Sequence, residues 1–374
     1  MTSIAKFAGI DDVVRLRPSV SWVERPEDQI EFFFGNTRRQ KTLRVEATLK
    51  SALRLMNGCN SLASIASQLS ISHQRLLDWT SHLVECSAVE RVAGVEWIEH
   101  SKWRRSLQML ADFIPDYDLL TVWNSIERTE FVILGCGAVG SWVADGIARM
   151  GGKRFVLVDP DTVVLSNLNR SLFDASDIGH KKTVAVARRL HNICQDVNVV
   201  EHQEHILKLE DLVRLITPKI SQVVVSCMDF PNVDMAANCA NEFCVKNLIP
   251  LVVAGGYNLH LSLIGLSVIP GKTACFDCSL AYLRKALDPE RLQVKKLPRQ
   301  NRNIGNIAPL AAITGSIASM EAIRLAIRDE RLPPVMTGKR GEFNFLDESF
   351  DWMEIPKQAD CKTCSHLDFA PAET

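Results

Sequence analysis

Beyond the first third of the chain, short apolar runs alternate with stretches that carry apolar residues at helical spacing. The runs at 131–134, 155–158 and 223–226 have the length and composition of strands that are buried in a parallel sheet. Helical spacing over 139–150 and 182–193 separates them. Strands and helices that alternate in this way predict an α/β fold with a doubly wound, Rossmann-like, mostly parallel sheet.

The same pattern continues toward the C-terminus, with two further strands expected at 197–202 and 250–254. A strand is also expected at 261–269, although it leaves the alternation of strands and helices. Residues 285–308 are basic and polar, which predicts a loop, and 308–328 is an apolar stretch rich in small residues, which predicts a helix.

The N-terminal region has a different pattern, in which an extended, turn-rich segment at 14–34 precedes helical periodicity. Three helices are expected, at 45–56, 61–69 and 72–86. A closing strand at 89–97 and a linking helix at 103–113 follow. Short strands followed by three short helices predict a small winged-helix-like module. We therefore divide the chain into residues 1–98 and 99–374.

The composition excludes several classes of partner. The formal net charge is −1 and the basic residues occur as scattered pairs, so no electrostatic field points to nucleic acid or to an anionic membrane. No run of 18 uncharged apolar residues occurs, and the N-terminus lacks the apolar core of a signal peptide. We therefore expect a cytoplasmic protein without a membrane span.

The eleven cysteines fall into two groups. Seven occur singly, several within apolar runs, and are interpreted as small buried residues. The other four form two Cys-x-x-Cys pairs, Cys275 with Cys278 and Cys361 with Cys364. Two such pairs supply four thiolates for a tetrahedral zinc ion, and a closed site of this kind has a structural role.

A glycine-rich turn follows the first strand of the predicted sheet. Gly135, Gly137 and Gly140 form a G-x-G-x-x-G motif that opens a helix, where backbone N–H groups can approach a phosphate. Asp159 ends the second strand, the position at which a carboxylate meets ribose hydroxyls. These features predict a nucleotide site, and by themselves they would equally fit an NAD enzyme.

The residues that follow favour ATP. Asp161, Arg170 and Lys182 come after the ribose acid, and a dehydrogenase has no need of this order of charges. Cations on a triphosphate stabilise the charge that develops as pyrophosphate leaves. Asp229 follows the strand at 223–226 and is well placed to hold Mg²⁺, which prefers oxygen ligands.

These motifs resemble the ThiF/MoeB family of ubiquitin-activating-type adenylating enzymes over roughly residues 102–366. Within that family the sequence is most similar to the peptide-modifying branch typified by the microcin C adenylating enzyme. The resemblance implies that MgATP is held by the glycine turn, the acid after it, an N-L-x-R segment, a lysine and a later aspartate. The expected cofactor-binding residues are Gly135, Gly137, Gly140, Asp159, Asp161, Asn167, Arg170, Lys182 and Asp229.

The resemblance also implies a homodimer in which an arginine reaches the ATP of the neighbouring subunit. The best match to the segment that carries it contains Arg105, with Arg104 as its neighbour, although the flanking residues differ from the family pattern. Arg170, Lys182, Asp229 and Arg105 are thus the expected catalytic residues. Asp234 stands where many members carry arginine. The zinc site of the family is structural and ties the chain end to the core.

The N-terminal module resembles the peptide-recognition elements of enzymes that mature ribosomally made peptides. The resemblance is carried by Arg15-Leu-Arg-Pro18 and by the segments 53–58 and 62–66. It implies a precursor peptide whose leader is added as a strand to an exposed sheet edge. A small structural or dimerisation domain is the alternative interpretation.

Together these features predict an ATP-dependent enzyme that adenylates a carboxylate of a ribosomal precursor peptide, in the biosynthesis of a peptide antibiotic. An internal amine, amide or other nucleophile would capture the acyl-adenylate. No acyl-thioester is expected, because the loop 285–308 contains no cysteine. Two alternatives remain: a MoeB/ThiF-like sulfur-carrier-protein adenylyltransferase, and a non-catalytic ThiF-like scaffold that presents peptides.

Overall fold

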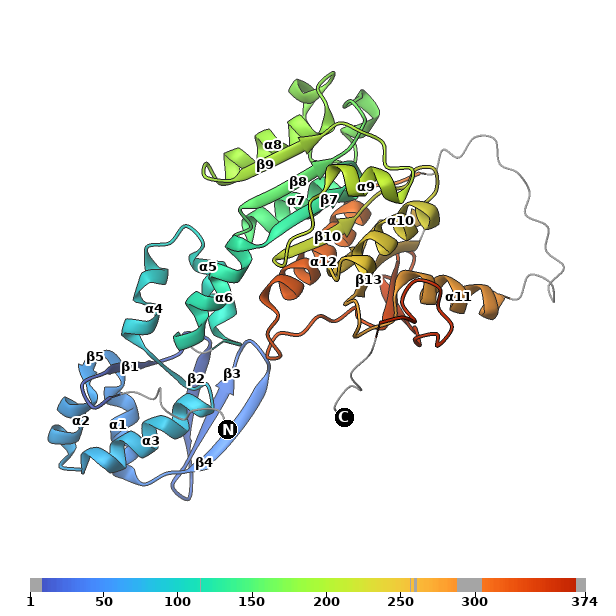
Figure 1. The fold of residues 1–374 in the computed structure, drawn as a ribbon. Coiled ribbons are helices and arrows are strands. Elements are labelled where there is room, and N and C mark those ends of the chain that lie inside the picture. Colours follow the sequence, from blue (N-terminus) through green and yellow to red (C-terminus); the bar gives the residue numbers. More distant parts are fainter. Residues whose placement is uncertain (1–8, 115, 256, 259–260, 288–304, 368–374) are drawn as a thin grey trace. The chain divides into compact units, whose positions relative to one another are not determined.

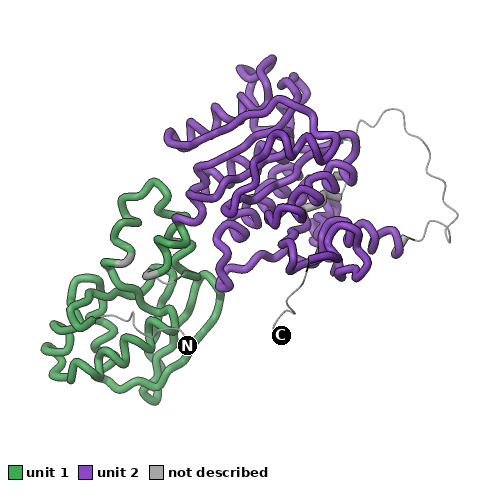
Figure 2. The backbone as a smooth tube through the Cα atoms, in the orientation of Figure 1, with its two compact units in different colours: residues 1–123 green, residues 124–374 purple. Residues whose placement is uncertain are grey.

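The computed structural model describes residues 9–114, 116–255, 257–258, 261–287 and 305–367. The chain forms two compact units, Met1–Trp123 and Asn124–Thr374 (Figure 2). The predicted division after residue 98, into a peptide-recognition domain and an adenylation domain, stays a prediction.

The first unit contains two small antiparallel sheets and a set of helices (Figure 1). One sheet has the order β2-β3-β4, with β2 at Val20–Arg25, β3 at Gln29–Phe34 and β4 at Arg39–Arg44. The other has the order β5-β1-β6, with β1 at Val13–Leu16, β5 at Asn57–Ser61 and β6 at Val89–Arg91. Three predicted helices are present, as α1 (Ala47–Leu55), α2 (Leu62–Leu69) and α3 (His73–Glu85). The Ser72 side chain caps α3 by accepting a hydrogen bond from the backbone of Arg75, as the sequence suggested.

The predicted strand at 89–97 is wrong beyond Arg91, because α4 (Val92–Glu99) begins there. The apolar residues Val95 and Ile98 are both buried and lie three positions apart, a helical spacing rather than an alternating one. The linking helix is present as α5 (Arg104–Ala111). A further helix, α6 (Asp116–Arg128), follows it and was not predicted.

The second unit is built on one large sheet with the order β15-β14-β13-β11-β10-β7-β8-β9 (Figure 1). Its parallel part consists of β7 (Glu130–Leu134), β8 (Arg154–Val158), β9 (Asn198–His202), β10 (Gln222–Ser226) and β11 (Leu251–Val253). An antiparallel extension follows, formed by β13 (Leu261–Val268), β14 (Lys339–Asn344) and β15 (Ser349–Glu354), with β12 (Tyr257–Asn258) paired to β13. The mostly parallel α/β fold is thereby confirmed, and the strand at 261–269 leaves the parallel pattern as expected.

In the described part of this unit, six α-helices connect or cover the strands. They are α7 (Ala138–Arg149), α8 (Lys182–Ile193), α9 (Leu209–Leu215), α10 (Val233–Lys246), α11 (Phe276–Leu287) and α12 (Ala308–Ile327). The helix α12 has the length and apolarity of a membrane span, but 67% of its most apolar window is buried inside this fold. It packs against α7 and β13, which identifies it as a core helix.

The predicted loop at 285–308 is corrected at its start, because α11 continues to Leu287. Residues 288–304 lie outside the described part of the chain. The hairpin of β14 and β15 was not predicted. In β15 every residue except Ser349 is exposed, so the apolar signal that marks a buried strand is weak.

Candidate functional site

The glycine turn lies at the carboxyl ends of β7, β8 and β10. Gly135 has a φ of +88°, and a Cβ there would come within 2.9 Å of the Cys227 carbonyl oxygen. At Gly140 a Cβ would lie 1.8 Å from the carbonyl oxygen of Gly135. Neither position accepts a side chain without moving the backbone. At Gly137, in contrast, a Cβ would meet no atom within 4 Å, which leaves open space for a phosphate at the N-terminus of α7.

Asp159 is held directly beside this turn. It is 5% exposed, and its Oδ2 accepts a hydrogen bond of 2.7 Å from the Cys136 backbone. Its Oδ1 accepts one of 2.9 Å from the backbone of Asp161. Burial raises the pKa of Asp159, although Lys182 and these two N–H groups oppose that shift. The carboxylate is therefore fixed at the position where it could accept hydrogen bonds from ribose hydroxyls.

Lys182 joins the two acids of this segment. Its Nζ lies 2.7 Å from Oδ2 of Asp161 and 3.8 Å from Oδ1 of Asp159. Burial by itself would lower the pKa of Lys182, but the charges of Asp159, Asp161 and Asp229 outweigh it and raise that pKa. The ammonium group is thus charged, although only 9% of the residue is exposed. Asp159, Asp161 and Lys182, three of the residues expected to bind the nucleotide, thus lie together.

Asn167 and Arg170 shape the segment between the ribose acid and Lys182. The Asn167 side chain accepts a hydrogen bond of 3.0 Å from the backbone of Val164 and so closes a tight turn. Arg170 donates from Nη1 to Oδ1 of Asn169 at 3.0 Å. Among the described residues no carboxylate lies within 4.0 Å of the Arg170 guanidinium, so its charge is available to an anion.

Asp229 follows β10 and is exposed. Its charge contributes to raising the pKa of Lys182, which indicates that the two groups share one electrostatic environment. Asp234 is also exposed and lies in the first turn of α10. An exposed carboxylate beside a phosphate site is suited to Mg²⁺, which keeps several of its water ligands.

Two further thiols lie at this edge of the sheet, and neither suits nucleophilic chemistry. Burial raises the pKa of Cys136, and it raises the pKa of Cys227 to about 12. A thiol reacts as the thiolate, so both groups are inert near neutral pH.

The four paired cysteines come together as predicted. Cys275, Cys278, Cys361 and Cys364 are all buried, and their sulfur atoms all lie within 4.8 Å of one another. Three of the Sγ–Sγ separations are 3.9, 3.6 and 3.6 Å. A tetrahedron with Zn–S bonds of about 2.3 Å has edges of about 3.8 Å, so this thiolate set fits zinc without rearrangement.

Neighbouring groups support the cysteine cluster. The backbone N–H of Gln358 points at Sγ of Cys278 over 3.4 Å. Thr363 donates to the Asp277 carboxylate, which ties the two Cys-x-x-Cys loops to each other. Hydrogen bonds of this kind orient metal ligands.

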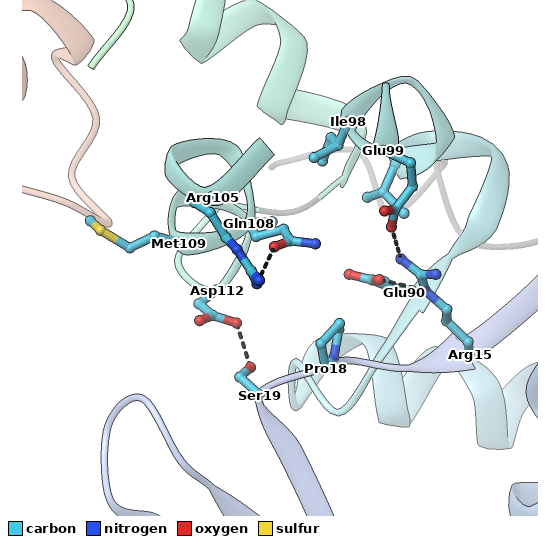
Figure 3. A pocket seen from close by; sticks show the side chains of 12 residues that line it. Arg15, Pro18, Ser19, Glu90, Ile98, Glu99, Arg105, Gln108, Met109 and Asp112 are labelled. Carbon is cyan, nitrogen blue, oxygen red and sulfur yellow. Dashed lines mark hydrogen bonds and ion pairs between the residues drawn. The ribbon is translucent and has the colours of Figure 1, made fainter. Parts of the chain in front are cut away.

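Arg105 lines a cavity of about 300 Å³ within the first unit (Figure 3). Its Nη1 donates to Oε1 of Gln108 over 3.5 Å. In the described residues no carboxylate lies within 4.0 Å of Arg105, whereas Arg104 is 3.6 Å from Glu99. Arg105 belongs to the first unit, whereas Arg170, Lys182 and Asp229 belong to the second.

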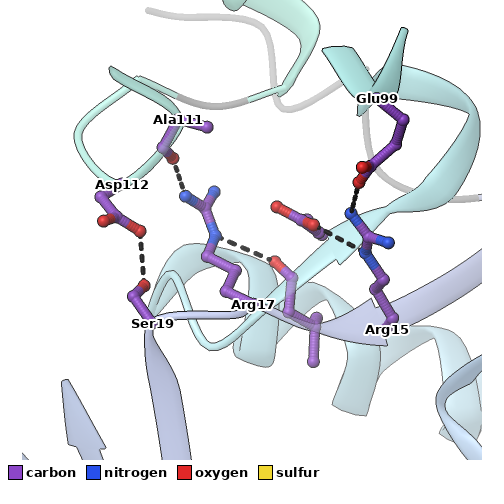
Figure 4. A network of polar contacts seen from close by, with 8 residues as sticks. Arg15, Arg17, Ser19, Glu99, Ala111 and Asp112 are labelled. Atoms are coloured by element: carbon purple, nitrogen blue, oxygen red, sulfur yellow. Dashed lines mark hydrogen bonds and ion pairs between the residues drawn. The ribbon is translucent and has the colours of Figure 1, made fainter. Parts of the chain in front are cut away.

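Sequence reasoning did not assign a role to Arg15 and Arg17, which it had listed only as part of a motif. Arg15 donates from Nε to Glu90 at 2.8 Å and reaches Glu99 at 3.4 Å (Figure 4). Arg17 is 5% exposed and donates to the carbonyl of Ala111 at the end of α5. These two arginines of one short segment fasten β1 to α4 and α5. In the sequence, the only indication of this role was that Arg15 and Arg17 alternate with apolar residues, as residues of one strand face do.

A model of the ThiF family matches residues 105–364. Among curated proteins, the ubiquitin-like modifier-activating enzyme 5 of Drosophila mojavensis is 26% identical over 294 residues, which are 75% of this chain and 68% of that protein. The same enzyme of Drosophila pseudoobscura pseudoobscura is 26% identical over 249 residues, or 64% of this chain and 59% of that protein. The chain thus spans about three fifths to two thirds of the length of these relatives.

Solved structures of similar fold cover almost the whole chain. E. coli MccB with ATP, and the microcin C7 biosynthetic enzyme MccB in complex with N-formylated MccA, each have a TM-score of 0.73 and 18% identity, and each match covers 94% of this chain and 99% of that chain. PaaA has a TM-score of 0.67 and 18% identity, over 91% of this chain and 99% of its own. At this level of identity the likeness shows a shared fold.

Proposed function

This chain belongs to the ThiF family and is an ATP-dependent adenylyltransferase of that family, and from this premise we propose that its substrate is a carboxylate of a ribosomally made precursor peptide. A carboxylate oxygen would attack the α-phosphorus of ATP, the bond to the β-phosphate would break, and pyrophosphate would leave. The acyl-adenylate would then be captured by a nucleophile, which gives a modified or cyclised peptide in the cytoplasm.

The nucleotide would occupy the edge at which β7, β8 and β10 end. The open space above Gly137 would receive the phosphates, and Asp159 would bind the ribose. Arg170 and Lys182 would stabilise the charge on the departing pyrophosphate. Asp229 and Asp161, whose charges both raise the pKa of Lys182, would hold Mg²⁺, which neutralises phosphate charge and aligns the leaving group. Two observations support this assignment: the open space at Gly137, and the lack of any carboxylate within 4.0 Å of the Arg170 guanidinium among the described residues.

The first unit supports the peptide part of the proposal. It contains a three-stranded sheet, β2-β3-β4, and among the described residues no strand pairs with the outer side of β2 or of β4. An extended peptide can be added to such an edge through main-chain hydrogen bonds. The MccB structure that holds N-formylated MccA shows that a protein of this fold accommodates a peptide.

The four cysteines would bind one structural zinc ion. The thiolates already stand at the separations that tetrahedral coordination requires, and a four-thiolate site leaves no open position for water. Its contribution would be to stability, because it connects the start of α11 with the segment after β15.

A homodimer belongs to the same proposal. Arg105 would reach the ATP of the neighbouring subunit, because its guanidinium has no carboxylate partner among the described residues, while Arg104 is engaged by Glu99. An arginine fork can hold two phosphate oxygens at once. This role requires the Arg105 side chain to leave the cavity that it lines in Figure 3.

One alternative has an observation in its favour. The curated relatives activate ubiquitin-like modifiers according to their names, which favours the C-terminal carboxylate of a small protein as substrate. A sulfur-carrier protein would be a substrate of the same kind. A non-catalytic scaffold would have no use for the paired Asp159 and Lys182, or for an Arg170 that has no carboxylate partner in the described residues.

Exchange of radioactive pyrophosphate into ATP tests the proposal, because formation of an acyl-adenylate is reversible. The purified enzyme is mixed with Mg²⁺ and ATP, and then either with small peptides encoded beside it or with a sulfur-carrier protein that ends in Gly-Gly. Exchange that depends on a peptide supports the proposal. Exchange with the carrier protein alone would assign the enzyme to the alternative, and mass spectrometry of co-expressed peptides identifies the modified carboxylate.

A further inference from the structure

The strand β4 is an open edge of the N-terminal sheet. It pairs with β3 along one side, and within the described residues no strand pairs with its other side. The residues of β4 are exposed or half-buried throughout. An open edge of this kind is a template for another extended segment.

The register of the sheet assigns the side chains of β4 to its two faces. Arg39, Lys41 and Leu43 pair directly with buried residues of β3, so they lie on the face that is covered by the helices. Lys41 donates from Nζ to Sγ of Cys86 at 2.7 Å, and Cys86 is the C-cap of α3. The free edge of β4 therefore runs beside the C-terminal end of α3.

The edge carries positive charge that is not neutralised. Residues 37–44 contain four cations and no acid. Arg44 lies 3.8 Å from Glu27, but in the part of the chain that the structure describes Arg38, Arg39 and Lys41 have no carboxylate within 4.0 Å. Arg39 instead lies over the Phe34 ring, 5.6 Å from its centroid. The cations thus remain available to an external anionic partner.

We propose that β4 recruits an acidic peptide segment as an additional strand. Directly opposed residues on neighbouring strands lie about 5 Å apart, so carboxylates two positions apart in the peptide would face Arg39 and Lys41. An apolar side chain two positions further along would meet Leu43. This inference rests on the proposed function and names the chemical class of the peptide that the first unit selects.

Protection of the edge is the competing explanation for the same charges. Lysines and other charged residues on edge strands prevent sheets from joining edge to edge. In that case the cations would repel other basic edges, and they would not discriminate between peptides by the position of their carboxylates. Peptide selectivity therefore separates the two explanations.

The first experiment measures fluorescence anisotropy with the full chain and labelled synthetic peptides. One peptide carries Glu-Thr-Glu-Thr-Leu, the second carries the reverse order, and each has a matched version with Gln in place of Glu. We expect one Glu peptide to bind roughly tenfold more tightly than its Gln version at low salt, with the difference shrinking as salt is added. Lys41→Glu should remove most of this preference. Arg44→Glu is the matched control, because Arg44 lies on the opposite face of the same strand and is already paired.

The second experiment locates the peptide. Cys86 is half-buried beside Lys41, and Cys59 is exposed on β5. The chain is alkylated with iodoacetamide with and without saturating Glu peptide, and labelling at each cysteine is followed by mass spectrometry. The peptide should slow the labelling of Cys86 by several fold and leave that of Cys59 unchanged.

Three results would each overturn the inference. The first is that neither Glu peptide binds at concentrations up to about 1 mM. The second is that Lys41→Glu and Arg44→Glu weaken binding of the Glu peptide equally. The third is that saturating peptide does not change the rate at which Cys86 is labelled. None of these results alters the pyrophosphate exchange assay. Peptide-dependent exchange together with any of them would leave the adenylation function in place and remove only the acidic peptide at β4.

Discussion

Replacing Lys182 by methionine should leave Asp159 buried without a counter-charge. Lys182 and Asp159 are 9% and 5% exposed, and their charged atoms lie 3.8 Å apart. At an effective dielectric constant of about 20, this separation corresponds to roughly 4 kcal/mol of attraction. Two backbone N–H groups remain on Asp159, so we expect a loss of about 3 kcal/mol, near the lower end for breaking a buried pair.

The loss should depend on pH in a defined direction. Without Lys182 the folded-state pKa of Asp159 rises further above its unfolded value, so the folded state disfavours the ionised form. The cost is therefore absent below the unfolded pKa of about 4, grows as the pH rises from there to the folded pKa, and is fully present above the folded pKa. The stability difference between variant and wild type should be larger at pH 8 than at pH 5.

Chemical denaturation and thermal unfolding measure this effect. A loss of about 3 kcal/mol corresponds to a decrease of roughly 6–12 °C in the melting temperature of a unit of this size. Asp161→Asn is the control, because it removes the exposed partner of Lys182 and should cost less than about 1 kcal/mol. A Lys182→Met protein as stable as wild type, or one equally destabilised at both pH values, would refute the electrostatic argument.

Three further predictions concern the nucleotide, the metal and the dimer. MgATP should raise the melting temperature and NAD should not. Gly137→Val should abolish this rise in melting temperature in a folded protein, because the new side chain enters the open space beside the turn. Gly140→Ala should instead unfold the turn, as circular dichroism would show. Purified protein should contain close to one zinc ion per chain by elemental analysis. Cys361→Ser should lower the solubility of the protein, because metal binding energy at such a site is folding energy. A stable wild-type protein without metal would contradict the zinc assignment. Arg105→Ala and Asp229→Ala should each lose most activity, and a statistical mixture of the two should regain about a quarter of it, because half of the dimers are mixed and each has one intact site. Confirmed subunit exchange without recovery would exclude a contribution of Arg105 across the subunit boundary.

The elements that the sequence predicted best are those whose pattern is local. Apolar runs at 131–134 and 223–226 become central strands because each is buried on both faces, and burial alone determines their composition. The stretch 89–97 was misassigned after Arg91 because a short apolar run fits either period, and the buried Val95 and Ile98 become visible as one helix face only in the fold.

The candidate site was predictable where spacing implies chemistry. Two Cys-x-x-Cys pairs predict a metal site even when the path of the chain between them is unknown, because four cysteine thiolates commonly bind zinc. The contacts of Arg17 with the end of α5, and of Lys41 with Cys86, join residues that are distant in sequence and carry no motif. Such contacts depend on tertiary packing and could not be derived from local periodicity.

The positions of the two cysteine pairs have a consequence for the continuity of the chain. Between Cys278 and Cys361 lie α12, β14 and β15, so with zinc bound the metal would close a covalent ring around the antiparallel end of the sheet. One peptide bond cut inside that ring would leave two fragments joined through four sulfur atoms. The entropy of closing a ring grows only slowly with its length, so sequence could be inserted or deleted between the pairs at small cost. Evolution could thus change the length of this segment while the C-terminal end of the chain stayed attached.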